Sequence, residues 1–224
     1  MPSWPVSVIP RNCLIGEVDE KVKQLLSTLP PQVDPAEKPI PKARNPRKTP
    51  WRNEPIGLRE DLYRAFGVDL TQVPGIDALT AQMLLTEIGP HLSAFPKVAA
   101  FASWLRLCPD KRVSGGKVLS SRTGPTKNRA ALALRMAAQG LHPSQTFLGE
   151  YYRRMRARLG APKAITAAAH KLARIVYHLL TMQQPYDESI FIQQEMRFRK
   201  RTEARLRAQA RELGFQLLPV EAVP

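Results

Sequence analysis

The longest helical pattern in this chain covers residues 163–182, whose sequence is KAITAAAHKLARIVYHLLTM. The apolar side chains that recur at helical spacing are Ile165, Ala168, Leu172, Val176 and Leu179. Pro162 stands at the start, where proline is tolerated because the first amides of a helix have no partner within it. The pattern predicts a long helix with one buried face.

Comparable patterns predict further helices on both sides of this one. They cover residues 58–66, 80–89, 95–109, 127–141, 146–159 and 189–213. In the helix at 95–109 the expected buried stripe is Val98, Phe101, Trp104 and Leu105, and in the helix at 80–89 the expected face is Leu79, Met83, Leu84 and Ile88. Residues 113–119 are the only short extended piece that we expect. The predicted class is therefore all-α.

The spacing of Ile15, Val18, Val22, Leu25 and Leu29 predicts a short coiled-coil helix at the N-terminus. Two heptads are too few for stability, so this helix needs a partner. Eight prolines follow in residues 30–55, which favours an extended, exposed linker. We divide the chain into a coiled-coil helix at 1–29, a basic linker at 30–57, a helical domain at 58–187 and a basic helix at 188–218.

The charge of the chain points to nucleic acid as its partner. The formal net charge is +15, from 34 Lys+Arg against 19 Asp+Glu. Residues 89–174 hold sixteen basic residues and two acids, so 16 − 2 = +14 of that excess lies there. A positive field of this density favours phosphate. No apolar run of about 20 residues is present to span a membrane, and neither cysteine has metal-site spacing. We expect a cytoplasmic protein with reduced thiols.

One loop concentrates chemistry. Residues 110–129 read DKRVSGGKVLSSRTGPTKNR, in which Ser114 precedes two glycines among six cationic side chains. Glycine lets a backbone approach a ligand closely, and Lys and Arg neutralise phosphate. We predict that Ser114 contacts or attacks a phosphodiester. The predicted nucleic-acid-binding residues are Arg112, Gly115, Gly116, Lys117, Arg122, Lys127, Arg129 and Arg135.

A second candidate contact is the turn at residues 73–77, VPGID, which leads into the helix at 80–89. This resembles a helix-hairpin-helix, whose turn aims backbone amides at phosphate. Asp77 replaces the second hairpin glycine, and an acid there weakens phosphate binding. Packing alone and DNA contact are both compatible with this pattern.

The sequence does not offer a complete active site. Two-metal phosphoryl transfer needs several converging carboxylates, and no paired metal-binding spacing is present. We therefore predict no metal site in this chain. No histidine lies close in sequence to Ser114 as a general base. Even if Ser114 attacks phosphate, it is half of an active site.

An ordered set of short motifs resembles one known family over about residues 58–187. The motifs are Pro74-Gly-Ile, Thr80-Ala, Glu87-Ile-Gly89, Phe101, Leu105, Leu107-Cys-Pro109, Ser114-Gly-Gly-Lys117, Asn128-Arg, Leu134-Arg135, Ala167, Lys171-Leu-Ala-Arg174, Tyr177 and Tyr186. This series resembles the C-terminal domain of transposases of the insertion-sequence 110/116/902 family.

The resemblance implies a function for Ser114, since the serine of that motif is the family's nucleophile that joins covalently to DNA. It further implies an N-terminal acidic, Mg²⁺-binding, resolvase-like domain, a guide (bridge) RNA, and homo-oligomers formed through a coiled coil. Residues 15–29 look like a piece of that coiled coil. The acidic domain has no counterpart here, so we expect a truncated transposase, a DNA recombinase fragment that is not active alone.

A non-enzymatic function is the alternative. A basic DNA- or RNA-binding fragment would use the same cationic residues as an electrostatic clamp, because binding can survive the loss of catalysis. A third alternative is a fragment that competes in oligomers of an intact transposase.

Overall fold

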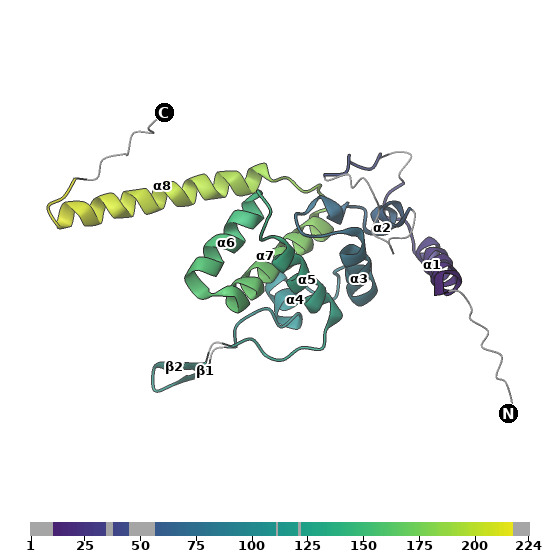
Figure 1. The fold of residues 1–224 in the computed structure, drawn as a ribbon, viewed down its shortest axis with the longest axis horizontal. Helices are drawn as coiled ribbons and strands as arrows, with labels where there is room; N and C mark the ends of the chain where they lie inside the picture. Colours follow the sequence, from purple (N-terminus) through teal and green to yellow (C-terminus); the bar gives the residue numbers. More distant parts are fainter. Residues whose placement is uncertain (1–10, 35–37, 45–56, 111, 121, 217–224) are drawn as a thin grey trace, which may run out of the picture. The chain divides into compact units, whose positions relative to one another are not determined.

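The protein is represented by a computed structural model that describes residues 11–34, 38–44, 57–110, 112–120 and 122–216. The side chains at 11–15, 112, 118, 191, 192, 194, 195, 198 and 199 lie outside that description. The chain divides into two compact units, residues 1–186 and residues 187–224. The described residues are mostly helical, with one two-stranded sheet, and the all-α prediction is confirmed (Figure 1).

The core of the first unit is built around α7, Ala161–Met182, which packs against α5, Arg129–Gly140, and α6, Phe147–Leu159 (Figure 1). The contact faces are rich in alanine. The buried alanines are Ala130, Ala131, Ala137 and Ala138 on α5 and Ala164, Ala168, Ala169 and Ala173 on α7. Small side chains let helix axes approach closely, so these faces fix the layer on which the remaining helices pack.

Helix α4, Val98–Trp104, also packs on α7 but is shorter than the pattern at 95–109 predicts. Phe101 and Leu105 are fully buried, as expected. Trp104 was predicted to be buried, and that is wrong, since 40% of it is exposed. Its ring lies over Phe95, with centroids 5.3 Å apart, and so covers the edge of the core without entering it.

Three short elements precede α4: α2, Leu58–Phe66; the 3-10 turn η1, Leu70–Gln72; and α3, Ala78–Ile88. Gly67 ends α2 in the left-handed region, as its position predicts. The buried side of α3 is rotated from the predicted face. It comprises Ala78, Ala81, Leu84 and Leu85, because α3 contacts α5 on one side and α2 on another.

Buried Asp69 ties the first unit together. Its Oδ1 accepts hydrogen bonds from the backbone N–H and the hydroxyl of Thr71, at 3.0 and 2.6 Å. Its Oδ2 accepts from Nε2 of Gln72 at 3.0 Å and pairs with the Arg59 guanidinium. Burial raises the pKa of Asp69, but these hydrogen bonds and the Arg59 charge outweigh burial, so the pKa lies below its ordinary value.

The same side chains hold the proline-rich segment against the helices. Arg59 donates to the carbonyl of Pro41 at 2.6 Å, and Gln72 donates to the carbonyl of Lys42 at 3.0 Å. The described linker residues are therefore held by the domain, whereas proline content predicted an exposed chain. Residues 45–56 of that linker lie outside the described residues.

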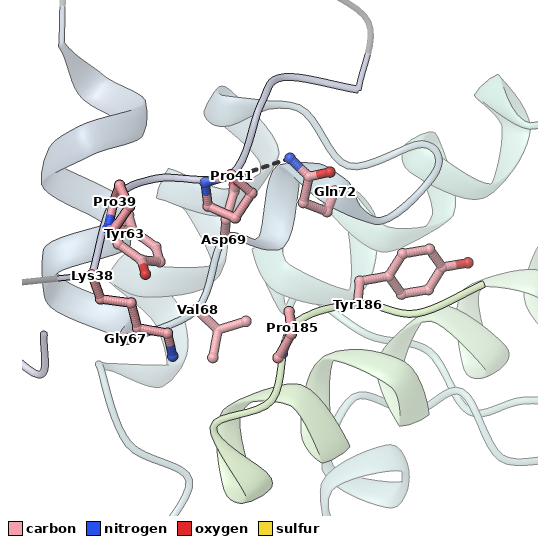
Figure 2. A pocket seen from close by; sticks show the side chains of 10 residues that line it. All are labelled: Lys38, Pro39, Pro41, Tyr63, Gly67, Val68, Asp69, Gln72, Pro185 and Tyr186. Carbon is pink, nitrogen blue, oxygen red and sulfur yellow. Dashed lines mark hydrogen bonds between the residues drawn. The ribbon is translucent and has the colours of Figure 1, made fainter. Parts of the chain in front are cut away.

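We call the described proline-rich residues 38–44 the strap. A hollow of about 170 Å³ lies under it (Figure 2). Its lining combines linker prolines with residues of the α2–η1 turn and with the chain just after α7. The lining residues are Lys38, Pro39, Pro41, Tyr63, Gly67, Val68, Asp69, Gln72, Pro185 and Tyr186.

The two terminal helices are α1, Arg11–Thr28, and α8, Ser189–Glu212. Leu26 of α1 is buried and α1 contacts α2, while Val18 and Leu25 of the predicted seam are 57% and 66% exposed. Asp187 accepts two hydrogen bonds from Ser189 at the start of α8, and these bonds lower the pKa of Asp187. In the described part of the chain, no helix is long and apolar enough to cross a membrane.

The Asp69 hydrogen bonds predict how stability depends on pH. Asp69→Asn should lower the free energy of unfolding at pH 7 by about 2 kcal/mol, less than for a fully buried pair because Arg59 is partly solvated. A lowered folded pKa contributes stability that is complete above the ordinary value of 3.8 and is lost as pH falls through the folded value. The difference in free energy of unfolding between wild type and Asp69→Asn should therefore become smaller only below about pH 4.

Urea unfolding from pH 2 to 7 measures this difference, and Glu60→Gln on the exposed side of α2 is the matched control. A difference that stays constant across this range would show that the Asp69 charge contributes nothing.

Candidate nucleic-acid interface

Ser114 lies at the tip of a β-hairpin. Strand β1, Arg112–Ser114, pairs antiparallel with β2, Lys117–Ser120, and the Ser114–Lys117 pair closes the ladder. Gly115 and Gly116, which form the two-residue loop, have φ of 55° and 77°. Positive φ at both central residues is the geometry of a type I′ turn, which matches the twist of the flanking strands. The glycines therefore permit the turn that presents Ser114.

The hairpin tip is open to solvent. Residues 113–117 are all exposed, and the two strands extend away from the helices (Figure 1). Residues opposite each other across an antiparallel ladder carry Cβ atoms about 5 Å apart on one face, so Lys117 lies beside Ser114. Of the predicted site residues, the structure thus brings together Ser114, both glycines and Lys117. Lys111 and the Arg112 side chain lie outside the described residues.

The base of the hairpin is closed by backbone contacts. The N–H of Asp110 donates to the carbonyl of Arg122 at 2.9 Å, and the N–H of Arg122 donates to Oγ of Ser120 at 3.3 Å. The side chains of Arg122 and Lys127 are exposed on the segment that returns from β2 to α5. Two more predicted phosphate ligands therefore follow the hairpin on a surface segment.

The last two predicted ligands have protein partners. Nε of Arg129, at the start of α5, pairs with Oε1 of Glu87 on α3 at 2.6 Å. Nη2 of Arg135 donates to the carbonyl of Arg106 at 3.3 Å. Arg129 is still 69% exposed, so its remaining donors face solvent. Both arginines fasten α5 to a neighbouring element in addition to any role with a ligand.

The turn at residues 73–77 is packed against the protein. A Cβ on Gly75 would lie 2.7 Å from the carbonyl oxygen of Ala137, so this glycine permits close contact with α5. Asp77 caps α3 by accepting from the N–H of Thr80 at 2.9 Å. The helix start that a phosphate would use already has a carboxylate acceptor. Of the two readings of this turn, the contacts favour packing.

The described residues do not provide a site for Mg²⁺. They contain no group of three or more His, Cys, Asp or Glu side chains that could hold a metal ion. Glu87 is paired with Arg129, and Asp69 is surrounded by donors. Hard divalent cations need several converging oxygens. The Mg²⁺ that the family resemblance implies for a separate acidic domain therefore has no ligand group among the described residues.

Sequence reasoning overlooked Arg106. This residue follows α4 with φ of 52°, and its guanidinium lies beside Gly124 in the return segment. The pattern at 95–109 placed Arg106 inside a helix, where nothing distinguishes it from other surface arginines. Arg106 is distinguished only by its positive φ and by the contact of its side chain with Gly124, 18 residues further along the chain.

The type I′ turn predicts a local effect of substitution at Gly116. Gly116→Val should unpair the hairpin, because a β-branched side chain in the left-handed region costs about 1–2 kcal/mol. Gly115→Asn should keep it, since Asn-Gly is a preferred type I′ pair. Nuclear Overhauser contacts between Val113 and Val118 measure pairing. The melting temperature of the helical core should change little, and persistent pairing in Gly116→Val would contradict the turn assignment.

Comparison with known proteins agrees with the motif series. Residues 69–153 match the model of the family described as Transposase IS116/IS110/IS902, which covers α3, α4, the serine hairpin and α5. No curated protein matches the chain. The family match confirms the resemblance and supports a transposase-related function that involves DNA. Residues 69–153 of this chain are therefore similar to the IS116/IS110/IS902 transposase family.

Proposed function

We propose that this chain is a DNA-binding part of a transposase and that Ser114 is its nucleophile for strand cleavage and exchange. The observation that carries the proposal is an exposed serine beside Lys117 on a glycine-turned hairpin. It lies inside the segment that matches a transposase family. A nucleophile for a polymer must be reachable from outside the fold, and Ser114 is.

The reaction would be a transesterification. Ser114 Oγ forms a bond to phosphorus, and the bond from phosphorus to one deoxyribose oxygen breaks. The hydroxyl proton passes to a base, and the leaving oxygen takes up a proton. Cationic groups near the phosphate, such as Lys117 and Arg122, offset the charge that builds on its oxygens. The phosphodiester is exchanged for a phosphoserine ester, so reversal rejoins DNA without another energy source.

The base would come from outside the described residues. Within them, no carboxylate or imidazole is hydrogen-bonded to Ser114, and no group of three or more His, Cys, Asp or Glu side chains could hold a metal ion. We propose that an acidic, Mg²⁺-binding domain beyond these 224 residues completes the site. The chain on its own would then bind DNA without cleaving it.

Partners beyond DNA follow from the terminal helices. Val18 and Leu25 lie one heptad apart, at the same position of the predicted seam, and both are exposed apolar side chains, which fits pairing with a second copy. Sedimentation equilibrium of Leu25→Asp should then show weaker self-association.

The basic residues of α8 fit a guide RNA by charge. They are Arg197, Arg199, Lys200, Arg201, Arg205, Arg207 and Arg211.

A non-catalytic DNA- or RNA-binding protein is the second candidate. The observation that favours it is the lack of a base at Ser114 among the described residues. Both candidates require phosphate binding, and they differ only in whether Ser114 becomes covalently bound.

Ser114→Ala separates the two candidates. A 5′- or 3′-labelled duplex is mixed with the chain, with and without a separately expressed acidic domain of the same family and Mg²⁺. Wild type should form a denaturation-resistant protein–DNA adduct only in the complete mixture, and Ser114→Ala should form none while binding DNA equally well. Ser93→Ala, at an exposed serine outside the hairpin, is the matched control and should form the adduct.

Binding itself is measured by fluorescence anisotropy across salt concentrations. The log–log slope should be about −0.9 for each phosphate neutralised. Absence of an adduct in the complete mixture would leave the binding protein as the function. A flat salt response would contradict both candidates.

A further inference from the structure

Helix α4 ends in a motif that normally requires glycine. The N–H of Arg106 donates to the carbonyl of Ser103 at 2.9 Å, and the N–H of Leu107 donates to the carbonyl of Ala102 at 3.1 Å. Leu107 is buried. This pair of bonds is the Schellman motif, in which the first residue after the helix C-cap has a left-handed conformation and is usually glycine. Arg106 occupies that position with φ of 52°.

Other helix ends in the chain follow the rule. Gly67 ends α2, and Gly214 follows α8 with the same two-bond pattern, both at positive φ. The other non-glycine residue at positive φ is Gln183, after α7, among the described residues. Its side-chain amide donates to the carbonyls of Phe66 and Leu180, so its strain has a structural explanation.

Arg106 has no comparable explanation. Arg106 is exposed. Within the described residues, its guanidinium donates to no protein acceptor and forms no ion pair. A glycine would satisfy the backbone with less strain. A residue in a strained backbone conformation that gains no stabilising contact from it is expected at functional sites.

The guanidinium is aimed at the base of the serine hairpin. A Cβ on Gly124 would lie 3.2 Å from its Nη1, so the Arg106 side chain rests on the return segment between Arg122 and Lys127. The Arg106 carbonyl accepts from Nη2 of Arg135. The Arg135 guanidinium on α5 is thus hydrogen-bonded to the backbone of the residue whose own guanidinium lies beside Gly124. In the described structure, neither is paired with a carboxylate.

We propose that Arg106, together with Arg135, forms a site for a backbone phosphate of the nucleic acid that the serine hairpin engages. This inference rests on the proposed function and extends it, since it names the residue that holds the strand at the base of the hairpin. Planar guanidinium groups bind phosphate oxygens through paired donors, and the absence of a side chain at Gly124 leaves room for the Arg106 guanidinium beside the return segment. Arg106 is a binding residue in this proposal and takes no part in proton transfer.

The test uses the whole chain and a duplex DNA probe. Arg106→Gly removes the guanidinium and keeps the left-handed backbone, so the variant should unfold at an equal or higher urea concentration than wild type. Its affinity should fall roughly three- to tenfold, with a salt slope smaller by about 0.9. Arg106→Lys should recover the slope and only part of the affinity, because an ammonium lacks the paired donors.

Gln183→Gly is the matched control. It makes the same change at the other non-glycine position of positive φ, but it removes hydrogen bonds to Phe66 and Leu180. It should lower stability and leave DNA affinity unchanged. Equal DNA binding and salt slope in wild type and Arg106→Gly would overturn the inference and leave the proposed function standing. Wild type without salt-dependent binding would overturn both.

Discussion

The close contact of α5 with α7 is the interaction on which the rest of this structure depends. Alanines on both helices, such as Ala131 and Ala168, are almost fully buried, and such small side chains let the two helices approach closely. This contact fixes α5, and α5 in turn receives the turn at Gly75, the Arg129–Glu87 pair and the Arg135 contact to the end of α4. A larger side chain in this layer would displace several anchors of the serine hairpin at once.

The distribution of stability across the fold follows from this arrangement. The Asn128 cap, whose side chain accepts from the N–H of Ala131, joins the end of residues 110–129 to α5, and the Asp110–Arg122 backbone bond closes the base of the hairpin within that segment. The hairpin between these ends is a two-stranded ribbon, which has little stability of its own. An element of this kind gains most from a ligand that contacts both strands. Rigid support beneath and an adaptable tip are the physical conditions for presenting Ser114 to a polymer.

Sequence reasoning succeeded where local rules decide the structure. The periodicity at 163–182 predicted α7, and Gly67 predicted the end of α2. It failed where contacts between residues far apart in the sequence determine the structure. Trp104 has the spacing of a core residue, but α4 ends there and the ring covers an edge. The strap at Pro41 depends on Arg59 and Gln72, and the position of Arg106 depends on Gly124, so no local pattern contains either.

The central claim is that the glycine-turned tip carrying Ser114 meets nucleic acid. Selective ¹⁵N-glycine labelling gives one amide signal for each of the 12 glycines, so a titration with duplex DNA reports on the hairpin directly. We expect the Gly115, Gly116 and Gly124 signals to shift and added salt to reverse the shift, while the signal of Gly67, buried beside Gln183, stays unchanged. DNA binding that moves other glycines and leaves Gly115 and Gly116 in place would contradict it.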